Sequence, residues 1–207
     1  YAPARESRDI VRFQERYGLF VGGEQVEPLS GEWYPTIEPA TEEHLAEVAT
    51  AREEDIDLAV SAARDAFENG WSTLPGSERA KYIFRIARIL LERSREFAVA
   101  ESLNSGKPIR ESRDVDVPIA AAHFFYYAGW ADKLEHAGFG PDPRPLGVAA
   151  QVIPWNFPMP IAGWGFAPAL AAGNTVVLKP AELTPLTATR LGELLPTVRQ
   201  HVAVDGL

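Results

Sequence analysis

A chain of 207 residues with 46% hydrophobic and 24% charged side chains has the size and composition of a globular protein with one sizeable core. Its net charge of −9 argues against nucleic acid as a partner, because contact with the phosphate backbone needs a basic face. No stretch is long and apolar enough to cross a bilayer and no signal-like segment opens the chain, so a cytoplasmic protein without a membrane partner is expected.

The N-terminal third is predicted to form an irregular arm, several short strands and one helix. Residues 1–16 are polar and are expected to lie over the surface. Residues 19–26 predict a hairpin that turns at a Gly-Gly pair, and residues 34–38 and 44–51 are expected to be edge strands. Residues 53–69 predict an amphipathic helix with an acidic first turn. Its apolar residues fall on one face, and they are Ile56, Ala59, Val60, Ala63 and Phe67.

Two further helices are predicted before the next strand. Residues 77–104 read as one continuous helix, capped by the Ser77 hydroxyl and closed by Gly106. Its inward-facing residues should be Ile83, Ile86, Ala87, Leu90 and Phe97. A shorter helix, rich in alanine and aromatic residues, is expected at 118–134. Residues 138–145 contain three prolines and predict a stiff linker.

Two short apolar runs follow, and each ends in a proline-bounded polar motif. The first run ends in Pro154-Trp155-Asn156-Phe157-Pro158, and the second, 175–178, ends in Lys179-Pro180-Ala181-Glu182. Each run reads as a buried strand followed by a helix, which predicts two adjacent βα units. Because ligands bind at the carboxyl edge of open parallel sheets, these motifs mark a candidate site.

Asn156 is a candidate catalytic residue with an ordinary alternative. Its uncharged amide has two N–H donors, which could stabilise the oxygen charge that develops when a carbonyl is attacked. Alternatively, Asn156 could cap the helix that begins near Met159 or hold the turn. The residues alone favour the cap.

Lys179 and Glu182 form a second candidate pair. A carboxylate can accept both hydroxyls of a ribose, while an ammonium donates to the same sugar. The alternative is a solvated Lys/Glu pair ahead of a helix in which Thr184 serves as the cap and Pro185 lies in the first turn. The residues alone favour this alternative.

Taken together, the two motifs resemble the aldehyde dehydrogenase superfamily. The segments 104–108 and 125–130 are similar to the N-terminal part of that family, and the likeness runs from about residue 17 to about residue 195. It implies an α/β fold with a helical N-terminal layer and a partial doubly wound, Rossmann-like parallel sheet. The implied divisions are an arm (1–16), a helical and hairpin part of the cofactor-binding domain (17–146), a βαβα nucleotide-binding half (147–195) and a divergent tail (196–207).

The resemblance also implies an activity, the NAD-dependent oxidation of aldehydes to carboxylic acids by a homo-oligomer. It assigns the oxyanion role to Asn156 and the adenosine ribose to Lys179 and Glu182, and a carboxylate there favours NAD over NADP. The implied cofactor-lining residues are Ile153, Pro154 and Trp155. The implied walls of an apolar aldehyde tunnel are Phe157, Ile161 and Trp164, for which core packing is the alternative. No metal site is expected, since the four histidines lack ligand spacing.

Several features depart from the family pattern. The sequence contains no cysteine and therefore no thiol nucleophile, it begins with Tyr1, and Gly165 stands where most relatives carry lysine. The 138–144 linker is shorter than in tetrameric members, and residues 201–204 are either a third strand or a terminus without a family counterpart. We therefore expect an N-terminal part of the enzyme that is inactive alone. The alternatives are a non-catalytic nucleotide-binding or interaction module and, less favoured, a different α/β enzyme.

Overall fold

The computed structural model describes residues 7–205, and side chains for residues 7–198. The strands in this part of the chain are β1 (Arg16–Tyr17), β2 (Leu19–Val21), β3 (Glu24–Val26), β4 (Trp33–Ile37), β5 (His44–Ala49), β6 (Val148–Val152) and β7 (Thr175–Lys179). The longer helices are α1 (Glu53–Glu68), α2 (Gly76–Glu92), α3 (Ser94–Ser105), α5 (Val117–Ala128), α6 (Pro158–Ala171) and α7 (Leu186–Asp205). The short helical turns are η1 (Arg8–Ile10), η2 (Trp71–Thr73), α4 (Ile109–Glu111), the π-helical η3 (Ser112–Asp116) and η4 (Leu134–His136).

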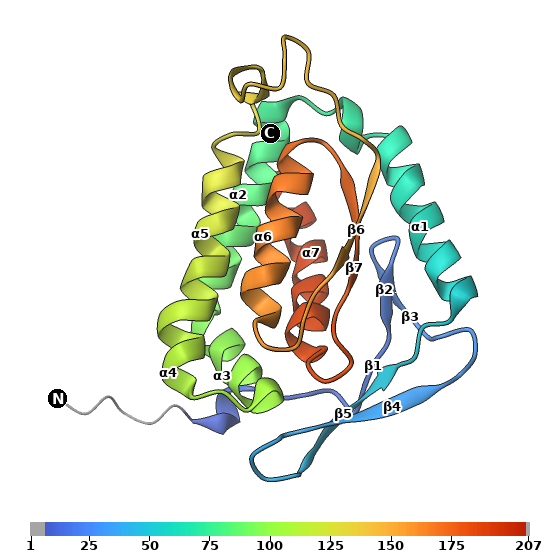
Figure 1. Cartoon of the computed structure of the whole chain (residues 1–207), viewed down its shortest axis with the longest axis vertical. Helices are drawn as coiled ribbons and strands as arrows, with labels where there is room; N and C mark the ends of the chain where they lie inside the picture. Colours follow the sequence, from blue (N-terminus) through green and yellow to red (C-terminus); the bar gives the residue numbers. More distant parts are fainter. Residues whose placement is uncertain (1–6, 206–207) are drawn as a thin grey trace, which may run out of the picture.

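The predicted α/β class is confirmed, with a helical layer beside a partial parallel sheet. Helices α2, α5, α6 and α7 pack against one another, and Figure 1 shows them as one block beside the β6–β7 pair. Together with side chains of α3, their facing side chains form the main hydrophobic core, in which Phe97 of α3 and Phe124 of α5 are fully buried. Burying an aromatic side chain of this size stabilises a fold by a few kcal/mol, so this core is the scaffold on which the strands rest.

The helix predicted at 77–104 is two helices, which corrects the single continuous helix. The chain leaves α2 at Arg93 and starts α3 at Ser94, because Arg93 has non-helical backbone angles. The predicted inward residues of both helices are buried, and Gly106 ends α3 in the left-handed conformation, as expected. Ser77 does not cap α2, since the helix already begins at Gly76 after Pro75.

The helix predicted at 118–134 is also shorter than expected. It ends at Ala128, and the following residues form turns that include η4. Upstream, α4 and η3 lead directly into α5, so the helical path starts at Ile109 rather than at Pro118. A π-helical turn of this kind moves the side chains of its residues out of simple helical register, and periodicity cannot reveal it.

The β6–β7 pair is parallel, as predicted, but its strands are not buried. It lies between α6 on one face and α1 on the other (Figure 1). It has no further strand on either side in the described structure, so most of its residues are only half-buried and Val152 is 74% exposed. The apolar face of α1 is likewise only partly covered, because Ile56 is 52% exposed.

The N-terminal elements agree with prediction in outline. Strands β2 and β3 form the expected antiparallel hairpin, with Gly22 and Gly23 at positive φ in its turn. Strands β4 and β5 pair antiparallel, and β1 adds to β5 in parallel. The predicted irregular arm is therefore wrong in part, because Arg16 pairs with Glu47. The first six residues of that arm lie outside the described residues.

The C-terminal helix corrects one further expectation. Residues 201–204, a candidate third strand, lie within α7, which extends to Asp205. The last two residues of the predicted tail are outside the described range. None of the described helices, α7 included, is long and apolar enough to cross a membrane.

Candidate functional site

Both predicted motifs begin at the same edge of the β6–β7 pair. The two strands are in parallel register up to Val152, which lies opposite Lys179. One residue later, the Ile153 amide donates to the Lys179 carbonyl at 3.1 Å, so the pairing continues to the point where the motifs start. The loops 153–158 and 180–185 therefore leave the sheet side by side, as the carboxyl ends of parallel strands must.

A side-chain hydrogen bond connects the two loops. The Thr184 hydroxyl donates to the Trp155 carbonyl at 3.3 Å. Thr184 is thus not the helix cap that the sequence suggested, and α7 begins instead at Leu186, whose amide donates to Asn104 Oδ1 at 2.9 Å. Because that acceptor comes from α3, the second loop is held by the helical layer as well as by the first loop.

Asn156 lies at the bend between β6 and α6, with its side chain exposed. The cap residue of α6 is Phe157, whose own side chain makes no capping hydrogen bond. The helix-cap alternative for Asn156 is therefore not what this structure contains. Within residues 7–198 its amide has no hydrogen-bond partner, which leaves both N–H donors available to a ligand.

The three residues before Asn156 differ in exposure. Pro154 is exposed and Trp155 is 58% exposed, so both present side-chain surface at the sheet edge. Ile153, in contrast, is only 2% exposed. Its side chain is buried, its backbone amide pairs with Lys179 at the edge, and its expected place in the cofactor lining stays a prediction.

Phe157, Ile161 and Trp164 follow one another on a single face of α6, at spacings of four and three residues. Phe157 and Trp164 are about half-exposed, and Ile161 is half-buried. Core packing therefore does not account for the two aromatic residues. The Trp164 ring meets the ring of His123 of α5 edge-on at 5.6 Å, and burial lowers the pKa of that imidazole. These side chains form an apolar strip leading away from Asn156.

Lys179 and Glu182 form an ion pair three residues apart, with both side chains more than half-exposed. The hydrogen bond from Lys179 lowers the pKa of Glu182, so this carboxylate stays ionised at neutral pH. The pKa of Tyr34 in β4 is raised to about 12, by burial first and by the negative charge of Glu182 second. Tyr34 is a neighbour of this pair that the sequence did not indicate, because it belongs to a different sheet.

Two charged residues behind the first loop were also missed. Lys107 places its ammonium 4.5 Å from the centre of the Phe157 ring. Glu101 accepts a hydrogen bond from the Met159 amide at 3.3 Å. A signal for Glu101 was present, since it lies four residues after the inward-facing Phe97 and so on the buried face of the same helix.

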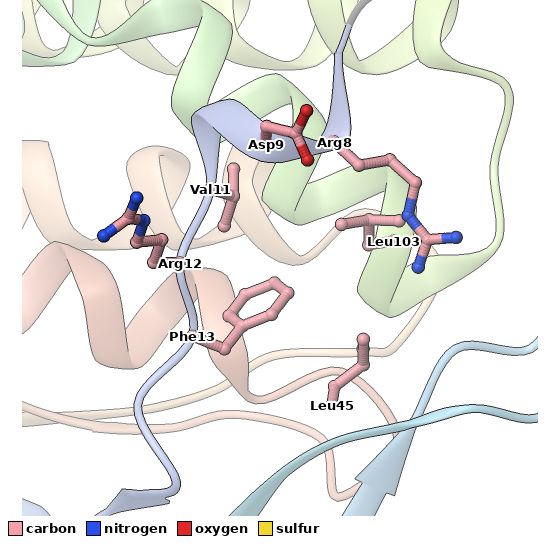
Figure 2. A pocket seen from close by; sticks show the side chains of 7 residues that line it. All are labelled: Arg8, Asp9, Val11, Arg12, Phe13, Leu45 and Leu103. Atoms are coloured by element: carbon pink, nitrogen blue, oxygen red, sulfur yellow. The ribbon is translucent and has the colours of Figure 1, made fainter.

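Two hollows of the described surface lie away from this edge. Figure 2 shows one of about 380 Å³ where the N-terminal segment passes α3 and β5. It is lined by Arg8, Asp9, Val11, Arg12, Phe13, Leu45 and Leu103. None of these belongs to the two motifs, and Arg8 is already paired with Glu38 at 2.6 Å. No group of three or more potential metal ligands comes together in the described residues.

Comparison with known proteins points to one family. A profile of the aldehyde dehydrogenase family matches residues 26–200. Aldehyde dehydrogenase family 2 member B4, mitochondrial, of Arabidopsis thaliana is 43% identical over 185 residues, which cover 85% of this chain and 34% of that protein. Aldehyde dehydrogenase B of Escherichia coli K12 is 43% identical over 198 residues, covering 90% of this chain and 38% of that protein.

Solved structures give the same result. The NAD⁺ complex of the aldehyde dehydrogenase from Bacillus cereus is 40% identical and superposes with a TM-score of 0.82, over 89% of this chain and 39% of that chain. The 207 residues thus span between a third and two fifths of the length of these relatives.

Proposed function

Because this chain belongs to the aldehyde dehydrogenase family, we propose that it supplies the coenzyme-binding and oxyanion-stabilising residues of an NAD-dependent active site that oxidises aldehydes to carboxylic acids. One observation supports this most directly. The unpartnered amide of Asn156 and the exposed Lys179–Glu182 pair emerge from neighbouring strand ends, at one edge of a parallel sheet. The parallel register of β6 and β7 brings the two motifs to the edge at which open parallel sheets bind ligands.

Asn156 is the proposed catalytic residue of this chain. Its N–H donors are free to approach an aldehyde oxygen, and they would stabilise the negative charge that forms there when the carbonyl carbon is attacked. Removing one such donor from an enzyme costs about 100- to 1000-fold in rate. The attacking thiolate implied by the family resemblance is not among these 207 residues, because they include no cysteine.

Lys179 and Glu182 are the proposed ribose contacts. The ionised carboxylate can accept from two adjacent hydroxyls and the ammonium can donate to one of them, which fits the sugar of a dinucleotide. NAD, when bound, would supply the acceptor for the hydride leaving the aldehyde carbon. Trp155 and Pro154 offer exposed surface on the path between this pair and Asn156. Phe157, Ile161 and Trp164 are proposed to line the aldehyde's approach.

Titration of the ¹⁵N-labelled chain with NAD, followed by NMR, tests the coenzyme role. We expect the signals of Trp155, Lys179 and Glu182 to move, and Glu182→Ala to weaken the binding at least about tenfold, the effect of losing roughly 1.4 kcal/mol. Glu78→Ala is the matched control, because Lys81 and Glu78 form an equally spaced exposed pair on α2. Equal affinity in both variants would contradict the proposed ribose contact.

A non-catalytic nucleotide-binding or interaction module is the second candidate. It needs Lys179 and Glu182 but no nucleophile, and the absence of cysteine from the sequence favours it. Aldehyde-dependent reduction of NAD by the purified 207-residue chain would exclude this candidate and would also contradict the expectation that the chain is inactive alone.

We propose that the chain self-associates through exposed apolar side chains on and beside the β6–β7 pair. Leu146, Val152 and Leu183 are each more than two thirds exposed, which is unusual for aliphatic side chains on a monomer. We expect light scattering to give a mass above the 22.7 kDa of one chain, and Val152→Lys to lower it. A monomeric mass at all concentrations would refute this.

A cytoplasmic location is proposed only from the sequence, and one relative is named as mitochondrial.

A further inference from the structure

The N-termini of α6 and α7 meet at a single buried carboxylate, that of Glu101 in α3. The Met159 amide, in the first turn of α6, donates to its Oε1 at 3.3 Å. The Thr187 hydroxyl, in the first turn of α7, donates to its Oε2 at 2.6 Å. Each of these helices follows one strand of the parallel pair. One side chain thus contacts both elements whose preceding loops carry the candidate site.

Lys107 extends this contact to the loop itself. Its ammonium lies 2.6 Å from Asp116 Oδ2, 3.8 Å from Glu101 Oε1 and 4.5 Å from the centre of the Phe157 ring. A cation over an aromatic face is attracted by the ring quadrupole. Since Phe157 is the residue after Asn156, the position of this ammonium is coupled to the residue that carries the free amide.

We propose that Glu101 and Lys107 are positioning residues that hold the Asn156 segment in place through Met159 and Phe157, and that the charge on Glu101 controls this position. Both act through the segment 156–159. The effect of this positioning on catalysis rests on the proposed role of Asn156. The positioning of the segment by Glu101 and Lys107 does not.

The charge on Glu101 is expected to change near neutral pH. Burial raises the pKa of this carboxyl to about 7, against the lowering effects of the Thr187 hydrogen bond, the Lys107 charge and the Met159 amide. The charged groups that face Glu101 are Lys107 and, with the opposite effect, Asp116. When Glu101 takes up a proton, Lys107 loses its attraction to that carboxylate, so the balance that holds its ammonium beneath Phe157 shifts toward Asp116.

The test follows the Trp155 indole N–H and the Asn156 side-chain amide of the ¹⁵N-labelled chain by NMR from pH 5 to pH 9. We expect both signals to move with one midpoint near neutral pH, and Glu101→Gln to abolish that transition. Glu96→Gln is the matched control, since it removes a partly buried carboxylate from the same helix whose partners, Arg93 and Arg190, do not contact the loop. It should retain the transition.

Thr187→Val provides an independent variant should Glu101→Gln fail to fold. It removes the shortest hydrogen bond to the ionised carboxylate, so the midpoint should move to higher pH. Retention of the transition in Glu101→Gln, or an unmoved midpoint in Thr187→Val, would overturn the proposal. No coenzyme is needed in these measurements, so failure to bind NAD would leave their outcome unaffected and would count against the proposed function alone.

Discussion

At the scale of single residues, Glu182 is the residue of the candidate site that bears most directly on the choice of coenzyme. It is exposed and paired with Lys179, as an ordinary surface glutamate would be. Two facts set it apart, namely its place directly beyond a parallel strand and its influence on the phenol of Tyr34. A carboxylate held ionised in this position would repel a phosphate placed on the same sugar, which is the physical reason to expect NAD over NADP.

Glu182→Gln should therefore relax the preference between the two coenzymes. Gln keeps the side chain's length and one acceptor but removes the charge, while Lys179 remains to attract a phosphate. We expect the ratio of NADP to NAD affinity to rise about tenfold, as for roughly 1.4 kcal/mol of removed repulsion. Competitive binding measurements with both coenzymes give this ratio directly. If the ratio stays the same in Glu182→Gln as in a Glu78→Gln control, the charge does not select the coenzyme.

At the scale of elements, local signals predicted well and tertiary contacts overrode them at identifiable places. The hairpin was predictable because Gly22 and Gly23 supply the positive φ angles that its turn requires. The break between α2 and α3 was not predictable, because only Arg93 leaves the helical conformation there and no proline or glycine marks the position. Periodicity continues across such a break and conceals it.

In the candidate site, too, local sequence signals were predictive and tertiary contacts were not foreseen. Residues of the two motifs were identifiable, because strand ends and prolines are local signals that place them at one edge. The support from Glu101, Lys107 and Thr184 was not identifiable as such, since it depends on how α3 packs against the starts of α6 and α7. The burial of the Ile153 side chain, beside the exposed Pro154 and Trp155, is determined by the same packing.

Helix α1 depends on one buried carboxylate at its start. Asp55 accepts from the Arg52 amide and from the Leu29 amide, each at 2.9 Å, while much of the helix's apolar side is exposed. Asp55→Ala removes both bonds, and we expect it to lower the free energy of unfolding by about 1–2 kcal/mol. Urea denaturation followed by circular dichroism measures this. Asp57→Ala, on the exposed side of the same helix, should change it little, and equal losses in the two variants would contradict the assignment.

At the scale of the whole molecule, stability should depend on pH through Glu101. Its pKa is about 7 in the folded chain against an ordinary value of 4.5, so folding favours its protonated form. The stabilisation associated with that proton is complete below about pH 4.5 and is lost as the pH rises through 7. Exposed carboxylates with lowered pKa values, such as those of Asp114 and Asp132, act in the opposite direction.

Comparison of the wild-type chain with Glu101→Gln isolates this contribution. Gln resembles the protonated acid, so the variant should gain stability relative to wild type between pH 5 and pH 8. The difference can change by no more than about 1.4 kcal/mol per pH unit, the limit for one proton. Denaturation midpoints at four pH values establish the slope. A difference that does not vary with pH would show that Glu101 ionises normally in the folded chain.

The two-stranded sheet at the centre of the molecule has a consequence for its amide hydrogens. In a parallel pair, each strand directs alternate amides toward its neighbour, as Thr175 and Ile153 do toward the carbonyls of Gly147 and Lys179. The intervening amides, such as those of Val152 and Val176, face outward, where the described structure offers no strand to receive them. Hydrogen exchange with deuterium should therefore be fast at every second residue of each strand. Slower exchange at the outward-facing amides would show that a further strand has paired there, either from a longer chain or from a second copy.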